Sequence, residues 1–332
     1  MPRSALLLLA ALTIGCTRTP PEPAARETGE RQSGAPARSA APALSAPVES
    51  PERPFRFPAA ERIVAIGDLH GDLASTREAL RLAGAIDETD HWIGKTLVLV
   101  QVGDQLDRGD DEPQILQLLE TLATEAARSG GAVHVLNGNH EIMNVAGDLR
   151  YVTEDGFRDY AGVSPGAKLP PNVPEQARGR AAAFRAGSDL SRKLAERNTI
   201  AIVGDTLFAH AGVLAKHLRY GIGRINDDVR RYFRGEIAAL PEVVGSDDAP
   251  VWTRVFGEQS PSAEACRELE AVLSALSVKR LVVGHTVQKA GVTSACGERV
   301  FRVDVGLSDY YGKNPTQVLE IRPGGVKVLG EK

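Results

Sequence analysis

Short apolar segments in this chain repeatedly end in side chains that can bind metal ions. RIVAIGD (62–68) and LVLVQVGD (97–104) each end in an aspartate, and AVHVLNGNH (132–140) ends in asparagine and histidine. In an open α/β sheet, ligands bind beyond the carboxyl ends of the strands. Side chains more than 200 residues apart in the sequence are therefore expected to meet at one place. In chain order they are Asp68, His70, Asp104, Asn139, His140, His210 and His285.

The segments between the first three predicted strands have helical periodicity. Apolar residues recur at helical spacing in 73–83 and 113–128. This strand–helix–strand alternation indicates an α/β core. Residues 199–212 predict a β-hairpin with its turn at Gly204–Asp205, and residues 317–330 predict a closing hairpin with a Pro-Gly-Gly turn.

The region between the third strand and the first hairpin is less regular. Residues 142–198 contain a loop rich in proline and glycine, followed by a predicted helix over 175–197. We expect this region to form an insertion, or cap, over one face of the domain. Residues 213–280 are expected to be mostly helical.

The first 16 residues have the pattern of a signal peptide. Arg3 is followed by the apolar run ALLLLAALTIG, which is too short to span a bilayer, and then by Cys16. Cysteine directly after Gly15 resembles the lipobox of bacterial lipoproteins, although Thr13 stands where leucine is usual. The alternative is an ordinary secretory signal with an incidental cysteine. Lipidation at Cys16 would place an exported protein in the bacterial cell envelope, in contact with the membrane only through its acyl chains.

The next segment predicts a tether rather than a folded domain. Residues 17–54 are rich in Pro, Ala, Ser, Glu and Arg and contain no aromatic residue. Burial of apolar side chains therefore cannot offset the entropy that this segment would lose on ordering. The globular domain is expected over 55–332. It contains Cys266 and Cys296, which can pair in an exported protein, but the spacing alone leaves the pairing open. The net charge of −4 disfavours nucleic acid as a partner.

The residues at the predicted strand ends form a mixed set of nitrogen and oxygen ligands. Carboxylates, imidazoles and an amide oxygen suit Mn, Fe or Zn better than Ca or Mg. Two metal ions about 3.5–4 Å apart need a bridging carboxylate and several terminal ligands. The sequence supplies both kinds of ligand.

Five motifs occur in an order that identifies a family resemblance. The chain resembles the calcineurin-like metallophosphoesterase superfamily, phosphoprotein phosphatase type, in GDLHG (67–71), GDQLDRG (103–109), GNHE (138–141), HAG (210–212) and GHT (284–286). It is similar to the bacterial Shewanella-like protein phosphatases in VWTR (251–254) and DVGLSDYYG (304–312). The resemblance covers roughly residues 61–312. It implies a β-sandwich of two mixed sheets flanked by helices, in four αββα layers.

The resemblance also implies a role for each motif residue. Two divalent metal ions, with manganese favoured over iron or zinc, would be bound by Asp68, His70, Asp104, Asn139, His210 and His285, with Asp104 as the bridge. His140, oriented by Asp107, would protonate the leaving oxygen. The phosphate would be bound by Arg108, Arg254 and Asn139, and Tyr310 or Tyr311 would line the site. Gln105-Leu106 and HAG depart from the eukaryotic family pattern without removing a ligand.

The implied activity is hydrolysis of a phosphate monoester by a hydroxide that bridges two metal ions. The expected substrate is a protein or peptide phosphorylated on Ser/Thr or Tyr. An alternative is an exported phosphoesterase for nucleotides or other small phosphate esters. A non-catalytic, lipid-anchored binding protein is disfavoured because no ligand position has been lost.

Overall fold

The structure is a computed structural model that describes residues 44, 51–164, 169 and 172–330. All of these lie in the second of two compact units, Ala43–Lys332. The predicted signal peptide, and the predicted tether apart from Leu44 and residues 51–54, lie outside the described residues. None of the helices in the described ranges is long and apolar enough to cross a membrane.

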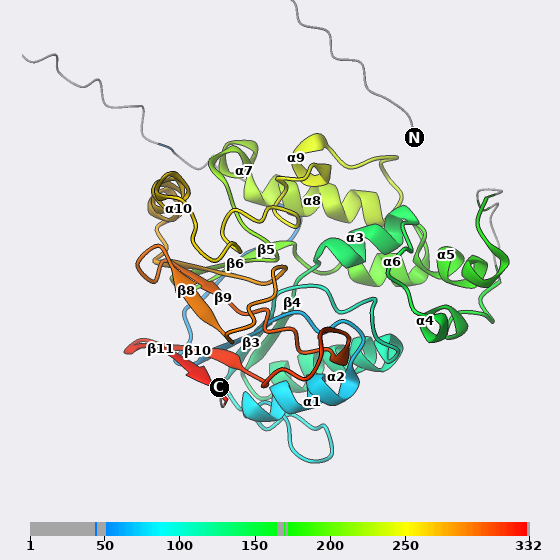
Figure 1. Cartoon of the computed structure of the whole chain (residues 1–332), viewed down its shortest axis with the longest axis horizontal. Helices are drawn as coiled ribbons and strands as arrows, with labels where there is room; N and C mark the ends of the chain where they lie inside the picture. The colour runs from blue at the N-terminus through cyan, green and yellow to red at the C-terminus, as the bar shows by residue number, and fades with distance from the viewer. Residues whose placement is uncertain (1–43, 45–50, 165–168, 170–171, 331–332) are drawn as a thin grey trace, which may run out of the picture. The chain divides into compact units, whose positions relative to one another are not determined.

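Two mixed β-sheets form the centre of the domain (Figure 1). The five-stranded sheet has the order β11-β10-β2-β3-β4, with strands Gly325–Leu329, Val318–Arg322, Ile63–Ile66, Val98–Gln101 and Ala132–Val135. The six-stranded sheet has the order β1-β5-β6-β7-β9-β8, with strands Arg56–Phe57, Ile200–Val203, Thr206–Ala209, Arg280–Val283, Val300–Arg302 and Thr293–Ala295. Strands β2, β3 and β4 are mutually parallel, as are β6, β7 and β9.

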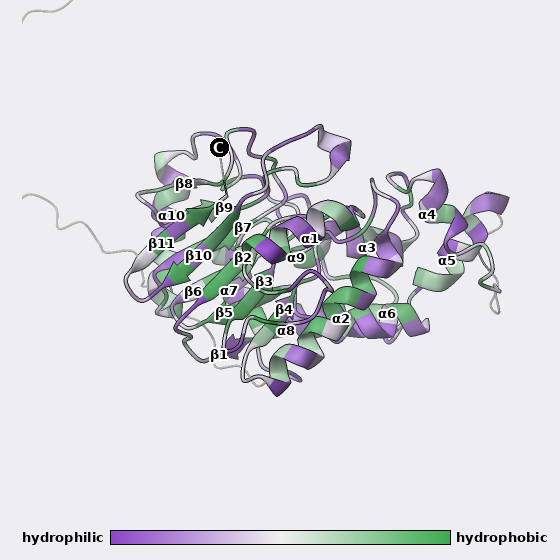
Figure 2. Cartoon of the chain, turned by 90° about the horizontal axis from the view of Figure 1, so that it is seen from below, coloured by the Kyte–Doolittle hydropathy of each residue, from purple (hydrophilic) through white to green (hydrophobic). Residues whose placement is uncertain are grey.

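The alternation of side chains along the strands explains why the sheets pack face to face. Ile63 and Ala65 of β2 join a core of apolar residues from both sheets, which includes Phe208 of β6. Their neighbours Val64 and Ile66 point the other way, into a second core. Successive side chains on a strand alternate between faces, so a central strand such as β2 contributes to two cores. Figure 2 shows these central strands as the most hydrophobic part of the chain.

Helices cover the outer face of each sheet and complete the four predicted layers. Helices α1 (Leu73–Leu82) and α2 (Glu112–Arg128) pack on the five-stranded sheet. Helices α7 (Ala215–Tyr220), α8 (Ile222–Phe233) and α10 (Ala263–Leu276) pack on the six-stranded sheet. The two-sheet α/β sandwich and both predicted hairpins are thus confirmed. The remaining short elements here are α9 (Glu242–Gly245) and the 3₁₀ turn η2 (Asp309–Tyr311).

The predicted insertion forms several short helices. It contains part of α3 (Asn139–Ala146), then α4 (Glu154–Arg158), the 3₁₀ turn η1 (Glu175–Ala177), α5 (Arg178–Phe184) and α6 (Asp189–Leu194). The single helix predicted over 175–197 is wrong. Arg185 adopts an extended conformation (ψ 146°), Gly187 has φ 82°, and the Ser188 side chain caps α6. The sequence carries a signal for this break, because glycine at 187 followed by serine at 188 is typical of a helix end and the N-cap of the next helix.

The described chain packs on the domain from the predicted boundary onward. Phe55 is buried in the core, and β1 pairs with β5. Two residues of the predicted tether also contact the domain: Glu52 binds Arg234 at 2.7 Å, and Arg53 forms an ion pair with Glu196.

Cys266 and Cys296 form a disulfide, which decides the pairing that the sequence left open. The bond connects α10 to the residue that directly follows β8. It therefore ties an outer helix to the edge strand of the six-stranded sheet.

Candidate metal centre and active site

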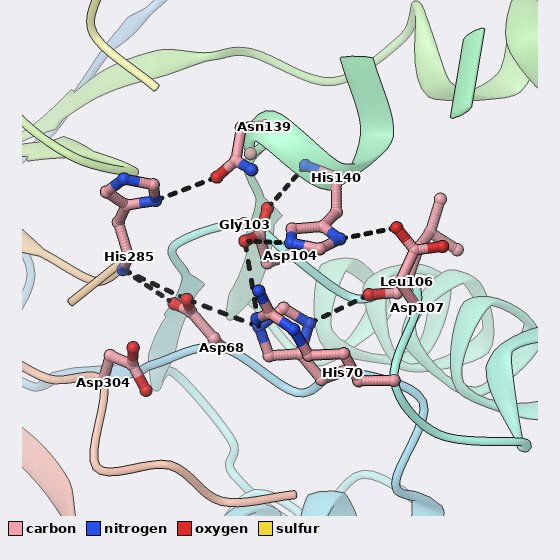
Figure 3. A network of polar contacts seen from close by, with 12 residues as sticks. Asp68, His70, Gly103, Asp104, Leu106, Asp107, Asn139, His140, His285 and Asp304 are labelled. Carbon is pink, nitrogen blue, oxygen red and sulfur yellow. Dashed lines mark hydrogen bonds and ion pairs between the residues drawn. The ribbon is translucent and has the colours of Figure 1, made fainter. Parts of the chain in front are cut away.

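The strand ends place all seven candidate residues close together; Figure 3 labels six of them, and His210 lies within 3.2 Å of both Asp104 and His285. The five-stranded sheet contributes Asp68 and His70 after β2, Asp104 after β3, and Asn139 and His140 at the start of α3. The six-stranded sheet contributes His210 after β6 and His285 after β7. Six of them are buried and His285 is half-buried. The parallel pairing within each sheet brings these ends to one edge.

Asp104 lies between two sets of possible metal ligands. Its Oδ2 atom is 3.2 Å from His210 Nε2 and 3.9 Å from His70 Nε2. Two triads could each hold a metal ion, with ligand atoms within 4.8 Å of one another, and both contain Asp104: His70–Asp104–His140 and Asp104–His210–His285. A carboxylate shared by two sites is the ligand that a pair of nearby metal ions requires.

The remaining predicted ligands complete the two sides of this centre. Asn139 Oδ1 lies 2.8 Å from His210 Nε2 and 2.9 Å from His285 Nδ1. On the other side, Asp68 Oδ2 lies 3.9 Å from His70 Nε2, and Asp68 accepts a hydrogen bond from the backbone N–H of His285. The six residues predicted as metal ligands are therefore brought together.

Backbone carbonyl groups orient two of the imidazoles. His70 Nδ1 lies 3.0 Å from the carbonyl oxygen of Leu106, and His210 Nδ1 lies 3.0 Å from that of Val102. A proton on Nδ1 leaves the lone pair on Nε2, which faces the centre; at His70 this nitrogen lies 2.5 Å from the Arg108 guanidinium. This is the usual outer hydrogen bond of a histidine that binds a metal ion.

The backbone around the centre is strained, and two glycines allow its close packing. Ten non-glycine residues of the described chain have positive φ, and five of them belong to the site: His70, Asp104, Asp107, Arg108 and His285. Such conformations cost free energy and persist where the surroundings enforce them. A Cβ atom at Gly138 or Gly284 would lie 2.2 Å from Asp104 Oδ1 or Asp68 Oδ1, respectively. Glycine at positions 138 and 284 therefore leaves the space that the carboxylates of Asp104 and Asp68 occupy.

The electrostatics of the site fit a divalent cation. Burial raises the pKa of Asp68 well above its usual value, and the nearby carboxylate of Asp304 adds to this effect. Burial opposes protonation of His210, but the charges of Asp104 and Asp68 prevail and raise its pKa to about 10. Closely packed carboxylates need a positive charge among them. A metal ion supplies that charge and releases protons from its ligands.

Asp304 is a site residue that the sequence reasoning did not assign. It lies two residues beyond β9, is buried, and its Oδ2 atom has no hydrogen-bond partner in the described part of the chain. Burial raises its pKa to about 6. VFRVD (300–304) is another apolar segment that ends in an aspartate. The rule that found the other ligands could therefore have found Asp304.

His140 and Asp107 form the predicted pair, and the insertion holds that pair in place. His140 Nδ1 lies 2.5 Å from Asp107 Oδ2. The other oxygen of Asp107 accepts hydrogen bonds from Asn144 at 3.0 Å and Arg180 at 3.1 Å. Arg180, on α5, is fully buried and also pairs with Glu112. Nothing in the local sequence around Arg180 marks it as a partner of Asp107, which lies 73 positions earlier.

Three tyrosines surround the guanidinium group of Arg108. The Arg108 side chain donates a hydrogen bond to the Tyr311 hydroxyl, and its carbon lies 5.1–5.6 Å from the ring centres of Tyr151, Tyr310 and Tyr311. Tyr311 also lies 5.7 Å from His70, whereas Tyr310 is 61% exposed. Of Tyr310 and Tyr311, between which the sequence does not decide, Tyr311 is therefore the residue that lies next to the candidate metal centre.

Arg254 lies at the rim of the site. It is exposed, and it donates a hydrogen bond to the Thr286 side chain, next to His285, at 3.3 Å. Its positive charge contributes to lowering the pKa of His285, after the larger effects of burial and His210. Arg254 is thus close enough to act on a group bound at the centre.

Comparisons with known proteins agree with this geometry. The sequence profile of the family described as Calcineurin-like phosphoesterase matches residues 61–289. Shewanella-like protein phosphatase 2 of Arabidopsis thaliana is 40% identical over 307 residues, with 82% of this chain and 78% of that protein covered. Shewanella-like protein phosphatase 1 of Plasmodium berghei is 29% identical, with 81% and 74% covered.

A solved structure shows the same fold. The cold-active protein-tyrosine phosphatase of a psychrophilic Shewanella species has a TM-score of 0.67 and 24% identity, with 83% of this chain and 82% of that chain covered. The family match covers more than half of this chain, and it includes every predicted metal ligand. The chain therefore belongs to the calcineurin-like phosphoesterase family and is an enzyme of the phosphatase type, similar to the Shewanella-like protein phosphatases.

Proposed function

We propose that this protein is a phosphomonoesterase that depends on two divalent metal ions and acts on phosphorylated proteins or peptides. The observation that supports the proposal most directly is the position of Asp104, which lies between His70 on one side and His210 on the other and is common to both groups of possible ligands. Metal ions held by Asp68, His70, Asp104, Asn139, His210 and His285 would acidify a water molecule and neutralise phosphate charge. The mixed nitrogen and oxygen donors suit Mn, Fe or Zn, and we propose Mn.

The side chains around the centre would bind and protonate the substrate. Arg108 and Arg254 offer guanidinium groups, which bind phosphate oxygens in a bidentate manner that lysine cannot match. His140 would give its proton to the leaving oxygen, and Asp107 would hold the imidazole in the required orientation. Asn139, which is within reach of both His210 and His285, would fix the phosphate side of the centre.

The rim of the site favours an aromatic leaving group. Tyr151 and Tyr310 are exposed and flank Arg108, so their rings are free to stack on an aryl ester bound there. We therefore propose phosphotyrosine as the preferred residue. The rings could equally stack on a nucleobase, which is the feature that favours hydrolysis of nucleotides as the second candidate function.

We propose further that the protein is exported and lipid-anchored through Cys16. The support is the signal-like sequence of residues 1–16 and the Cys266–Cys296 disulfide, because disulfides are typical of oxidising compartments.

Replacing Asp104 tests the metal centre. Asp104→Asn keeps the side-chain shape but removes the shared charge, so we expect Mn²⁺-dependent hydrolysis of p-nitrophenyl phosphate to fall roughly 100-fold or more. Bound metal, measured by mass spectrometry of the purified full chain, should fall in parallel. Asp110→Asn, at an exposed position in the same loop, is the matched control and should behave as wild type. Wild-type metal content and turnover in Asp104→Asn would contradict the proposal.

Substrate preference is measured on the wild-type protein. A phosphotyrosine peptide should be hydrolysed with a higher kcat/KM than the same peptide with phosphoserine, and both faster than AMP. Faster turnover of AMP than of either peptide would favour the second candidate function.

His140 should matter most for poor leaving groups. His140→Ala removes the proton donor, so kcat for phenyl phosphate should fall about 10²–10⁴-fold, and that for p-nitrophenyl phosphate by clearly less. The nitrophenolate ion leaves readily without a proton, which explains the difference. An equal loss on both esters would show that His140 does not act as the acid.

Arg180 should act through Asp107 rather than on the substrate. Arg180→Lys keeps the charge but loses the forked geometry, so we expect kcat for phenyl phosphate to fall roughly tenfold with little change in KM. The loss for p-nitrophenyl phosphate should be smaller, as for His140→Ala. Arg178→Met, on the exposed face of the same helix, is the control. An equal loss on both esters, in a variant with wild-type Tm, would mean that Arg180 only supports the fold.

Lipidation is tested by labelling. Cells that express the full chain should incorporate labelled palmitate into it, and Cys16→Ser should abolish the label. A wild-type protein that takes up no label would favour the ordinary secretory signal.

A further inference from the structure

A cavity away from the metal centre has an unusual polar wall. It has a volume of about 510 Å³ and lies beside α2 and the edge strand β4. Residues from the amino-terminal segment, the end of the insertion and α8 complete it. A volume of this size is in the range of small-molecule sites. None of the residues that line it belongs to the site described above.

One wall of the cavity presents an arginine without a counter-ion. No carboxylate of the described residues lies within 4 Å of the half-buried Arg197 side chain. Its hydrogen bond goes to the neutral side chain of Gln105, at 2.6 Å. Burial lowers the pKa of Arg197, and the more distant carboxylates of Glu141 and Glu120 oppose this only in part. A guanidinium group in such a place retains donors for an anion.

A second arginine on the cavity also has an unused donor. Arg230 is buried; it donates to Asp227 at 2.8 Å and to the side chain of Asn198. Its Nε atom is buried and has no partner among the described residues. This Nε atom is not accessible from the cavity, so Arg230 contributes to the wall without adding a donor that a ligand can reach.

The other charges around the cavity are paired. Arg53 binds Glu196, and Lys193 lies 3.5 Å from Glu120. Burial lowers the pKa of His134 to about 4, so this ring adds no charge at neutral pH. The unpaired charge at the cavity is therefore that of Arg197.

The rest of the lining is apolar and partly aromatic. Phe57 stacks on His134 with ring centres 4.0 Å apart. Leu119, Ala123 and Val133 supply further apolar surface. A ligand that fills this space would combine one anionic group with an apolar or flat body.

We propose that this cavity is a second binding site, which takes a small organic anion. A phosphate or carboxylate group of the ligand pairs with Arg197, and the body of the ligand packs against the Phe57–His134 pair and Leu119. The site is separate from the metal centre and does not depend on the proposed phosphatase activity.

The cavity is connected to the metal centre by a short chain of contacts. Arg197 binds the Gln105 side chain, and Gln105 directly follows the shared ligand Asp104. The backbone N–H groups of Asp104 and Gln105 both donate to Glu141, at 3.0 and 2.9 Å. An anion that draws Arg197 away from Gln105 acts on the loop that holds Asp104. We infer that occupancy of the cavity changes metal affinity, and by linkage that metal binding changes affinity for the anion to the same extent.

A fluorescent aromatic sulfonate, 8-anilinonaphthalene-1-sulfonate, is the probe for the first test. The full chain, loaded with Mn²⁺, should bind one equivalent with a rise in fluorescence. Arg197→Met preserves length and apolar volume but removes the charge, and it should weaken binding roughly tenfold. Arg231→Met, which changes an exposed arginine beside Arg230 on α8, is the matched control and should bind as wild type.

The outcomes separate a ligand site from a structural arginine. Arg197→Met should keep or raise the Tm, because an unpaired charge is removed from a partly buried place. Equal probe affinity in Arg197→Met and wild type would overturn the proposal, as would binding to wild type with no fixed stoichiometry. The linkage is tested by measuring the Kd of Mn²⁺ with and without saturating probe. Identical values would overturn the inferred connection to Asp104.

Discussion

The mutual repulsion of carboxylates at the strand ends is the constraint on which this structure depends. Asp68, Asp104 and Asp304 are all buried at one edge of the sandwich, and burial raises the pKa of Asp68 and Asp304. Such a cluster is stable only with positive charge inside it. The surrounding imidazoles and a divalent cation can both provide that charge, and the cation does so with the directionality that hydrolysis requires.

The fold supplies the rigidity that the cluster needs. Asp68, Asp104, His210 and His285 follow β2, β3, β6 and β7, whose side chains alternate between two cores, so packing on both faces fixes the positions of these strand ends. The turns after the strands can then be held in strained conformations, as at His70, Asp104 and His285. The candidate site residues lie on loops, but these loops directly follow the strands of the two sheets.

Most of the centre could be predicted from the sequence because its signal is local. Each ligand stands at the end of an apolar run, so a rule about strand ends finds it without knowledge of the partners. Asp304 obeys the same rule, and it was missed because its motif was assigned no metal role. Tyr311 could not be separated from Tyr310, because that choice depends on which ring faces Arg108 and His70.

Contacts between distant segments could not be predicted in this way. Arg180 and Arg197 both come from the irregular stretch after α3, where neither periodicity nor motif marks them. Arg180 pairs with Asp107, and Arg197 donates a hydrogen bond to Gln105, so the two arginines contact the loop 104–108 at positions two residues apart. The insertion therefore does more than shape the entrance to the site. It contacts the loop that contains Asp104, Asp107 and Arg108, which are the proposed shared metal ligand, the proposed partner of the acid and a proposed phosphate-binding arginine. A change in this distant segment can alter catalysis without any contact to the substrate.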